Sequence, residues 1–252
     1  MIRFCDDTPC STAGCDPVVC TGSGSGKVCR LSTYTHTWIA NAQSTWTGCV
    51  TDRTQPYDTQ IIAPTTTATM FPANQYYENG EAYCATNNSP PLQPIMPLSY
   101  DWTALKATIS AMQPTGGTNQ AIGLAWAWQS LAQNAPMNAP VEDPNYTYRK
   151  AIILLSDGLN TEDRWPANGD GSQQFNGSID ARQRIMCDDI KAAGITIYTI
   201  QVNTSNPPDA TSSVLSYCAS GSQNFYLLYS ASQVVTAFNS IGTSLSKLRV
   251  AR

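Results

Sequence analysis

In the second half of the chain, apolar residues recur with the two periods that mark strands and helices. Residues 151–155 form an apolar run too short for a helix, with charge before it and Ser-Asp-Gly after it. Such a run is typical of a strand buried on both faces of a parallel sheet. Residues 195–202, which are rich in β-branched side chains, and residues 224–229 are predicted as two further strands.

Helices separate and flank these strands. Asp101 can cap one helix, Thr118 and Asn119 are both good caps for the next, and Gly194 can end a third. The pattern predicts helices over residues 101–112, 118–133, 180–193, 211–218 and 231–247. Strands that alternate with helices in this way indicate an α/β fold built on a doubly wound parallel sheet.

Residues 1–97 lack this regular alternation and are rich in Ser, Thr and Pro. Five cysteines fall within the first thirty residues: Cys5, Cys10, Cys15, Cys20 and Cys29. Two segments prone to β structure, 34–39 and 44–50, could pair as a short hairpin. We therefore expect an irregular, Cys-rich insertion over residues 1–97 and the α/β domain over residues 98–252.

The nine cysteines of the chain favour disulfides in an oxidising compartment. A zinc knuckle fits less well, because successive cysteines at the N-terminus are not separated by the two-residue gaps of zinc sites and His36 is the single histidine. Cys187 and Cys218 lie near the ends of two helices that flank one strand, so they can form a disulfide. Cys49 with Cys84 is a second candidate pair.

The charge and the apolar content of the chain indicate which classes of partner and which location it fits. The chain carries 14 basic and 18 acidic residues, with no basic cluster beyond Lys247, Arg249 and Arg252, which argues against nucleic acid. Charged residues make up 13%, against a usual share of about 25%, and this favours an extracytoplasmic protein. The sequence shows neither a signal peptide nor a membrane span, so we expect a longer protein whose N-terminal part is missing.

Asp157 is the first candidate for chemistry. It falls just past the carboxyl end of the predicted strand 151–155, where open α/β sheets place their ligand sites. A carboxylate followed by Gly158 suits a hard cation or an amine. Asn119 and Asn160 are interpreted as cap and loop residues.

Two motifs then combine, since Gly116-Gly117-Thr118-Asn119 opens one helix and Leu155-Ser-Asp157-Gly158 ends the next strand. This pair resembles the second and third metal motifs of the von Willebrand factor A domain. The resemblance implies that Thr118 and Asp157 help to hold a divalent cation, usually Mg²⁺. A small hard ion takes hydroxyl, carboxylate and water oxygens, and can leave one position for a carboxylate of a protein partner.

Longer stretches are similar to TadG-type proteins of the tight-adherence (Flp) pilus system of Gram-negative bacteria. They include residues 98–102, 123–128, 146–148, 158–165, 179–182 and 238–252, and more loosely 34–62. This resemblance implies the C-terminal portion of a von Willebrand A-like domain in a non-catalytic cell-envelope protein. Such a protein lies on the periplasmic side of the inner membrane or at the cell surface, serves pilus assembly or adhesion, and meets the membrane through an N-terminal helix.

The chain also departs from the family. The first metal motif, Asp-x-Ser-x-Ser, and the strand before it are not found. Asp209-Ala-Thr211-Ser-Ser213 is the nearest match, but it follows two prolines and is interpreted as a helix start. We therefore expect a metal site that is incomplete in this chain and an open apolar edge beside residues 151–155.

Two alternatives fit the same residues. The chain could be a structural envelope module whose metal site is vestigial. It could also be a metal-assisted hydrolase, which needs a general base that Glu162, Asp163 or Asp170 could supply. The segment 22–27 lacks the spacing of a phosphate-binding loop, and the sequence has no Gly-x-Ser-x-Gly motif to make a triad with His36. We therefore expect a non-enzymatic protein.

Overall fold

A computed structural model of the chain describes residues 55–71, 93–113, 118–161 and 178–247, with Gly48, Val50, Arg53 and the backbone of four short strands. Two compact units are present: Met1–Cys49 with Ala73–Ala85, and Val50–Pro72 with Thr86–Arg252. In the first unit, β1 (Val18–Thr21) pairs with β2 (Val28–Leu31) and β3 (Tyr77–Glu78) with β4 (Glu81–Ala82), both antiparallel. The predicted hairpin over residues 34–50 lies outside the described residues, except for Gly48 and Val50.

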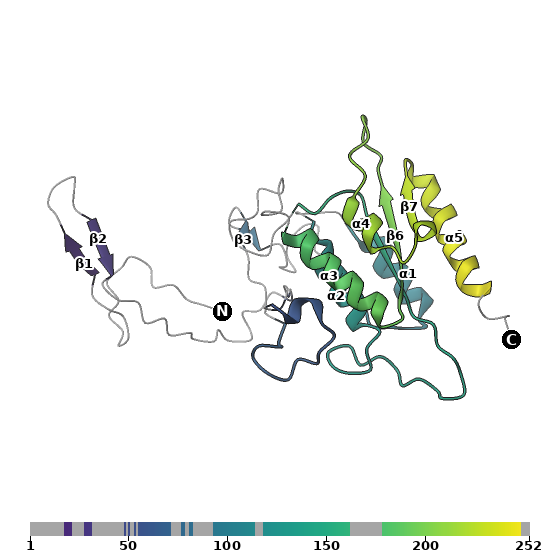
Figure 1. Cartoon of the computed structure of the whole chain (residues 1–252), viewed down its shortest axis with the longest axis horizontal. Helices are drawn as coiled ribbons and strands as arrows, with labels where there is room; N and C mark the ends of the chain where they lie inside the picture. Colours follow the sequence, from purple (N-terminus) through teal and green to yellow (C-terminus); the bar gives the residue numbers. More distant parts are fainter. Residues whose placement is uncertain are drawn as a thin grey trace. The chain divides into compact units, whose positions relative to one another are not determined.

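The second unit is built on a three-stranded parallel sheet (Figure 1). Its order is β5 (Ala151–Ser156), β6 (Thr196–Val202) and β7 (Phe225–Leu228). Residues 152 and 155 of β5 pair with Ile197 and Ile200 of β6, so the carboxyl ends of the strands meet at one edge of the sheet. The predicted α/β class and the three predicted strands are confirmed.

Helices form at the five places where the pattern predicts them, and the last four of the five pack against the sheet. The five helices are α1 (Trp102–Ala111), α2 (Gln120–Gln129), α3 (Ser178–Ala192), α4 (Ser213–Cys218) and α5 (Ala231–Lys247), with 3-10 turns η3 (Tyr57–Thr59) and η5 (Ser222–Asn224). None of the helices in the described part of the chain is both long and apolar enough to cross a membrane.

The caps explain where three helices begin. The Asp101 carboxylate accepts the backbone N–H of Thr103 and of Ala104, as predicted. Asn119 Oδ1 caps α2, and Thr118 lies one residue outside it, so Thr118 is not the cap. Ser212 caps α4, which confirms that the segment 209–213 starts a helix.

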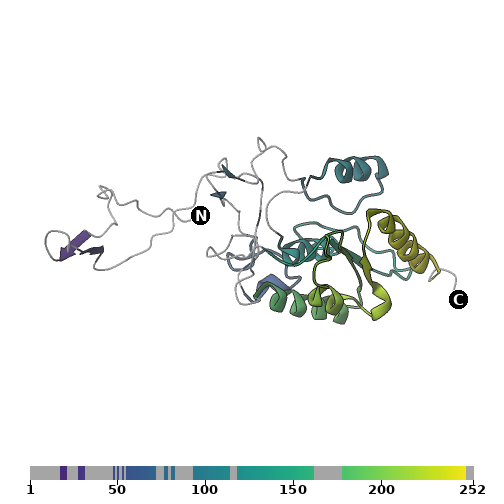
Figure 2. The ribbon, with the colours of Figure 1, turned by 90° about the horizontal axis from the view of Figure 1, so that it is seen from above.

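The two faces of the sheet carry two separate apolar clusters. One face packs against α2, α3 and α4, and its core includes Leu124, Ile152, Met186 and Ile197. The opposite face packs against α5, with Tyr198, Ile200 and Ile241 in its core. Figure 2 shows α3 and α4 on one side of the sheet and α5 on the other. Alternation along β6 divides its side chains between the two clusters, because successive residues of a strand point to opposite faces.

The prediction that residues 151–155 are buried on both faces is wrong. On the side of α2 and α3, Ile152 is 4% exposed, but on the side of α5, Ile153 is 36% and Leu155 46% exposed. The reason is position, since β5 is the edge strand of the described sheet and α5 packs over β6 and β7. Apolar side chains of this edge strand are therefore open to solvent, as the sequence analysis predicts.

A segment from the predicted insertion folds onto the α/β unit. The Arg53 guanidinium, 2% exposed, donates to the carbonyl oxygens of Ile62 and Gln60 and lies 4.4 Å from the centre of the Phe71 ring. The Phe71 ring lies 4.5 Å from that of Trp126 in α2. Burial lowers the pKa of Arg53, although the nearby Asp58 acts in the opposite sense. This strap, defined as Arg53 and residues 55–71, is held by hydrogen bonds to one buried cation.

Candidate functional site

The segment before α2 and the segment after β5 lie side by side at the carboxyl edge of the sheet. The Thr118 backbone N–H donates to Thr161 Oγ1 at 2.9 Å, and the Thr161 N–H donates to the Thr118 carbonyl oxygen at 2.9 Å. Asp157 follows β5 directly and its side chain is exposed, whereas that of Thr118 is half-buried. The structure thus brings the two segments that carry the predicted metal ligands to one rim.

Gln120, the first residue of α2, is hydrogen-bonded to the end of β5 and to the turn after it. Its Nε2 donates to Ser156 Oγ at 3.0 Å and to the Gly158 carbonyl oxygen at 2.9 Å. These acceptors stand on either side of Asp157 in the chain. The Gln120 backbone N–H also donates to Asn160 Oδ1 at 2.7 Å. A single residue therefore contacts positions 156, 158 and 160, at the end of β5 and in the turn after it.

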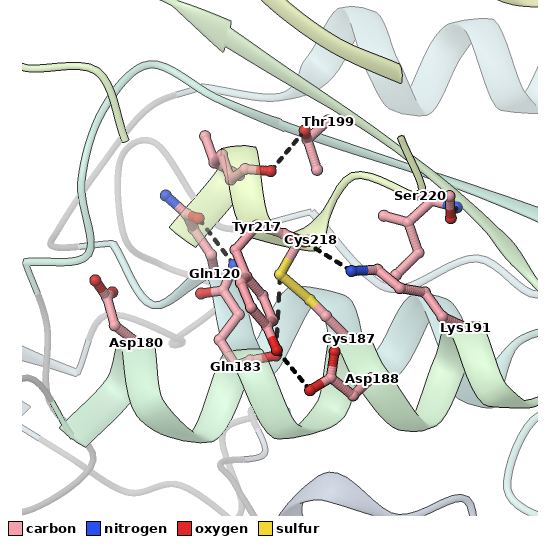
Figure 3. Close-up of a disulfide and its surroundings, with 12 residues drawn as sticks. Gln120, Asp180, Gln183, Cys187, Asp188, Lys191, Thr199, Tyr217, Cys218 and Ser220 are labelled. Atoms are coloured by element: carbon pink, nitrogen blue, oxygen red, sulfur yellow. Dashed lines mark hydrogen bonds between the residues drawn. A yellow bond between two sulfur atoms is a disulfide. The ribbon is translucent and has the colours of Figure 1, made fainter. Parts of the chain in front are cut away.

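A second layer connects the rim to α3. Gln183 Nε2 donates to Gln120 Oε1 at 3.1 Å (Figure 3), and Asn160 Nδ2 donates to Gln183 Oε1 and to Asp180 Oδ1, both at 2.9 Å. Gln120, Asn160 and Gln183 are 5%, 4% and 0% exposed. We call these three side chains the amide network. Burying an amide without a hydrogen-bond partner destabilises the folded state. The amide network can be buried because its side chains are hydrogen-bonded to one another.

The amide network was not predicted. Asn160 was expected to be a loop residue, which it is, but its burial was not foreseen. The available signal was spacing, since Gln120 lies two residues after Thr118 and Asn160 lies three residues after Asp157. Polar side chains so close to both candidate ligands are natural partners for one another when the two segments meet.

Thr118 and Asp157 offer the oxygen donors of the rim. Within the described residues, neither the Thr118 hydroxyl nor the Asp157 carboxylate makes a hydrogen bond, whereas Ser156 Oγ accepts from Gln120 Nε2. A hydroxyl and a carboxylate fit a small hard cation such as Mg²⁺ in chemistry. The same part of the chain contains no group of three or more His, Cys, Asp or Glu side chains that could hold a metal. Gly116, Gly117, Glu162, Asp163 and Asp170 lie outside the described residues.

The predicted disulfide between Cys187 and Cys218 is confirmed. It joins α3 to α4 with 5.2 Å between the two Cα atoms, and both residues are fully buried (Figure 3). Gln183 lies one helical turn before Cys187, so the disulfide and the amide network share one face of α3. The other candidate pair, Cys49 with Cys84, lies outside the described residues.

Beside the disulfide, an exposed tyrosine is surrounded by charge. The Tyr217 hydroxyl donates to Asp188 Oδ2 at 2.7 Å, and its ring faces Arg184 at 4.7 Å and Lys191 at 4.9 Å. The hydrogen bond to Asp188, helped by desolvation and by the negative charge of Asp188, raises the pKa of Tyr217, while Arg184 acts against it. Lys191 Nζ also donates to the Tyr217 carbonyl oxygen, so this contact holds α4 on α3.

Comparison with known proteins gives little beyond this description. No family model matches the chain, and no curated protein matches it. A structure of proximal thread matrix protein 1 from the mussel byssus is similar at 21% identity and a TM-score of 0.36, covering 55% of this chain and 28% of that one. A second crystal form of that protein gives 17% identity, a TM-score of 0.34, and coverage of 55% and 27%. The chain thus spans about a quarter of the length of that protein, and TM-scores this low support no argument about fold or function.

Proposed function

We propose that the chain is part of a non-catalytic cell-envelope protein that binds a protein partner through a divalent cation. The cation, Mg²⁺ in the first instance, would be held at the carboxyl edge of the sheet, with Thr118 and Asp157 supplying two oxygen ligands. In this proposal the fold is the C-terminal portion of a von Willebrand A-like domain, and the whole protein is TadG-like and serves pilus assembly or adhesion.

The observation that carries the proposal is the meeting of two chain segments at one rim. The paired bonds between Thr118 and Thr161 hold the two segments side by side. The carboxyl end of a parallel strand is where open α/β sheets bind ligands, because loops from successive strands converge there. A hydroxyl and a carboxylate in such a place, free of hydrogen bonds to other described residues, are available as ligands.

Two features of the chain, a disulfide and a low share of charged residues, support the proposed location in the cell envelope. A buried disulfide between Cys187 and Cys218 requires an oxidising environment at the time of folding. The low share of charged residues, 13%, points the same way. We therefore propose the periplasmic side of the inner membrane or the cell surface of a Gram-negative bacterium, with membrane attachment only through an N-terminal helix.

When bound, the cation would offer an open coordination position to an acidic side chain of the partner. Thr118 and Asp157 provide two ligands, so water and other residues must fill the remaining positions of an octahedral ion. Binding by this chain is therefore expected to be weak, and its specificity would come from loops around the rim.

Calorimetric titration with Mg²⁺ tests the proposal. The wild-type chain should give a saturable signal that Asp157→Asn and Thr118→Val each abolish, because each substitution removes one of two ligands. Asp189→Asn is the matched control, since Asp189 is an exposed carboxylate on α3. Equal binding by the Asp157→Asn and Asp189→Asn variants would refute a site at the rim.

A second candidate, a structural envelope module with a vestigial site, is favoured by the completeness of the amide network. Gln120, Asn160 and Gln183 hold the rim through bonds that involve no metal. In that case Mg²⁺ should produce neither heat nor a change in melting temperature, whereas a functional site should raise the melting temperature by mass action.

A further inference from the structure

We infer that Gln120 is a positioning residue, which holds Asp157 and Thr118 in a fixed arrangement so that both can face one cation. The inference rests on the proposed function and deepens it. Gln120 touches neither a cation nor a partner. It acts through the backbone on either side of Asp157 and through its own place two residues after Thr118.

The contacts of Gln120 are concentrated on one short turn. Its side-chain nitrogen bonds residues 156 and 158, its backbone nitrogen bonds Asn160, and its side-chain oxygen accepts from Gln183. The four partners lie at the end of β5, on the turn after it and on α3. A residue needed only to anchor the N-terminus of α2 would not require contacts on both sides of an exposed aspartate.

The chain provides an internal comparison for this arrangement. Gln129 lies at the other end of α2 and is 1% exposed, as deeply buried as Gln120. Among the residues that the structure describes, its Nε2 reaches only the Gln60 carbonyl oxygen, at 3.4 Å, and its Oε1 has no hydrogen-bond partner. The two buried glutamines of α2 thus differ in their hydrogen bonds. Gln120 bonds the residues on both sides of Asp157, whereas Gln129 makes one long hydrogen bond to the strap.

Fixing Asp157 matters because an exposed carboxylate on a free turn would lose conformational entropy on binding a cation. A turn already held by hydrogen bonds has lost that freedom during folding. Residues that orient metal ligands in this way typically change metal affinity by roughly 10–100-fold when they are replaced. We expect an effect of this order at Gln120.

The test uses the whole chain and Mn²⁺ as the probe, with binding followed by water-proton relaxation and stability followed by circular dichroism without metal. Gln120→Met keeps the length of the side chain but removes its hydrogen bonds, and should weaken Mn²⁺ binding roughly 10-fold or more. Gln129→Met is the matched control and should leave affinity unchanged. Affinities are measured well below both melting temperatures, so that a loss of stability alone does not alter them.

Thr161→Val is a milder second variant, in case Gln120→Met does not fold. It removes the hydroxyl that accepts the Thr118 N–H and should also weaken Mn²⁺ binding while the melting temperature changes little. The inference is overturned if the wild type binds Mn²⁺ through Asp157 but Gln120→Met and Thr161→Val bind it as tightly as the wild type does. In that case the proposed function is retained without the positioning role of Gln120. If the wild type shows no binding that depends on Asp157, the proposed function fails and the inference with it.

Discussion

Arg182 and Asp58 lie 124 residues apart in the sequence and form a two-bonded ion pair, with Nε to Oδ2 at 2.7 Å and Nη2 to Oδ1 at 2.5 Å. The pair joins α3 to the strap. The Asp58 side chain is 5% exposed and that of Arg182 is 22% exposed. The negative charge of the buried Asp58 carboxylate is therefore stabilised by Arg182 and by the neighbouring Arg53 rather than by water. An irregular stretch of sequence thereby becomes a fixed part of the α/β unit.

Replacing Arg182 with Lys should therefore destabilise the folded chain although the charge is kept. A lysine ammonium cannot make the planar two-bonded contact and leaves a buried carboxylate half-satisfied. We expect the free energy of unfolding to fall by about 1–3 kcal/mol, at the low end for a buried pair because Arg182 is partly exposed. Urea denaturation measures this change. Arg149→Lys, at an exposed arginine, is the control, and equal losses for the two variants would contradict the role of the pair.

Replacing both Cys187 and Cys218 with Ala should destabilise the chain by about 3 kcal/mol, because the disulfide closes a loop of 31 residues and restricts the unfolded state. Chemical denaturation of the double variant and of the wild type gives the difference. Digestion of the unreduced protein followed by mass spectrometry should yield a peptide that contains both cysteines. Recovery of these cysteines as free thiols would show that this bond is absent.

The neighbouring residues Ile152 and Ile153 should respond very differently to the same substitution. Ile152→Ala should cost about 2–3 kcal/mol, since Ile152 is 4% exposed within the cluster under α2 and α3. Ile153→Ala should cost less than about 1 kcal/mol, because its side chain is already 36% exposed. Thermal or urea unfolding of the two variants compares them directly, and similar losses would mean that the α5 side of β5 is covered in solution.

The open side of β5 also predicts self-association. Exposed apolar residues on an edge strand favour pairing between copies, and a polar residue there should reduce it. Leu155→Thr, at a side chain that is 46% exposed, should lower the associated fraction in sedimentation velocity without a large change in melting temperature. A variant that associates as strongly as the wild type would indicate that copies meet elsewhere.

Tyr217 should ionise at higher pH than an ordinary tyrosine, chiefly because its hydroxyl donates to Asp188. Because the pKa of Tyr217 is raised in the folded state, the contact adds its full share to the free energy of unfolding at pH values below the unfolded pKa of about 10. This stabilisation is lost as the pH rises through the folded-state pKa. Asp188→Asn should move the pKa of Tyr217 back toward its usual value. NMR titration of labelled tyrosines, with the signal assigned by Tyr217→Phe, follows this shift, and an unchanged pKa in Asp188→Asn would refute the cause.

Local sequence was enough to determine the elements of the α/β unit. The apolar run at residues 151–155 predicts β5, although one face of that strand is exposed, and the β-branched residues at 195–202 predict β6. The caps Asp101 and Ser212 specify where helices begin because their oxygens satisfy free N–H groups. Asp157 could be placed at the carboxyl end of a strand for the same reason. These features depend on residues that are close together in the chain.

Only the tertiary structure decided what lies across from each element. The exposure of Ile153 depends on which helix covers the sheet, and the burial of Gln120, Asn160 and Gln183 depends on three segments meeting. The Arg182 contact to Asp58 likewise depends on a long closure of the chain. Hydrogen bonds and burial act over a few ångströms in space, so sequence shows that these polar groups need partners, and the fold selects which partners they have.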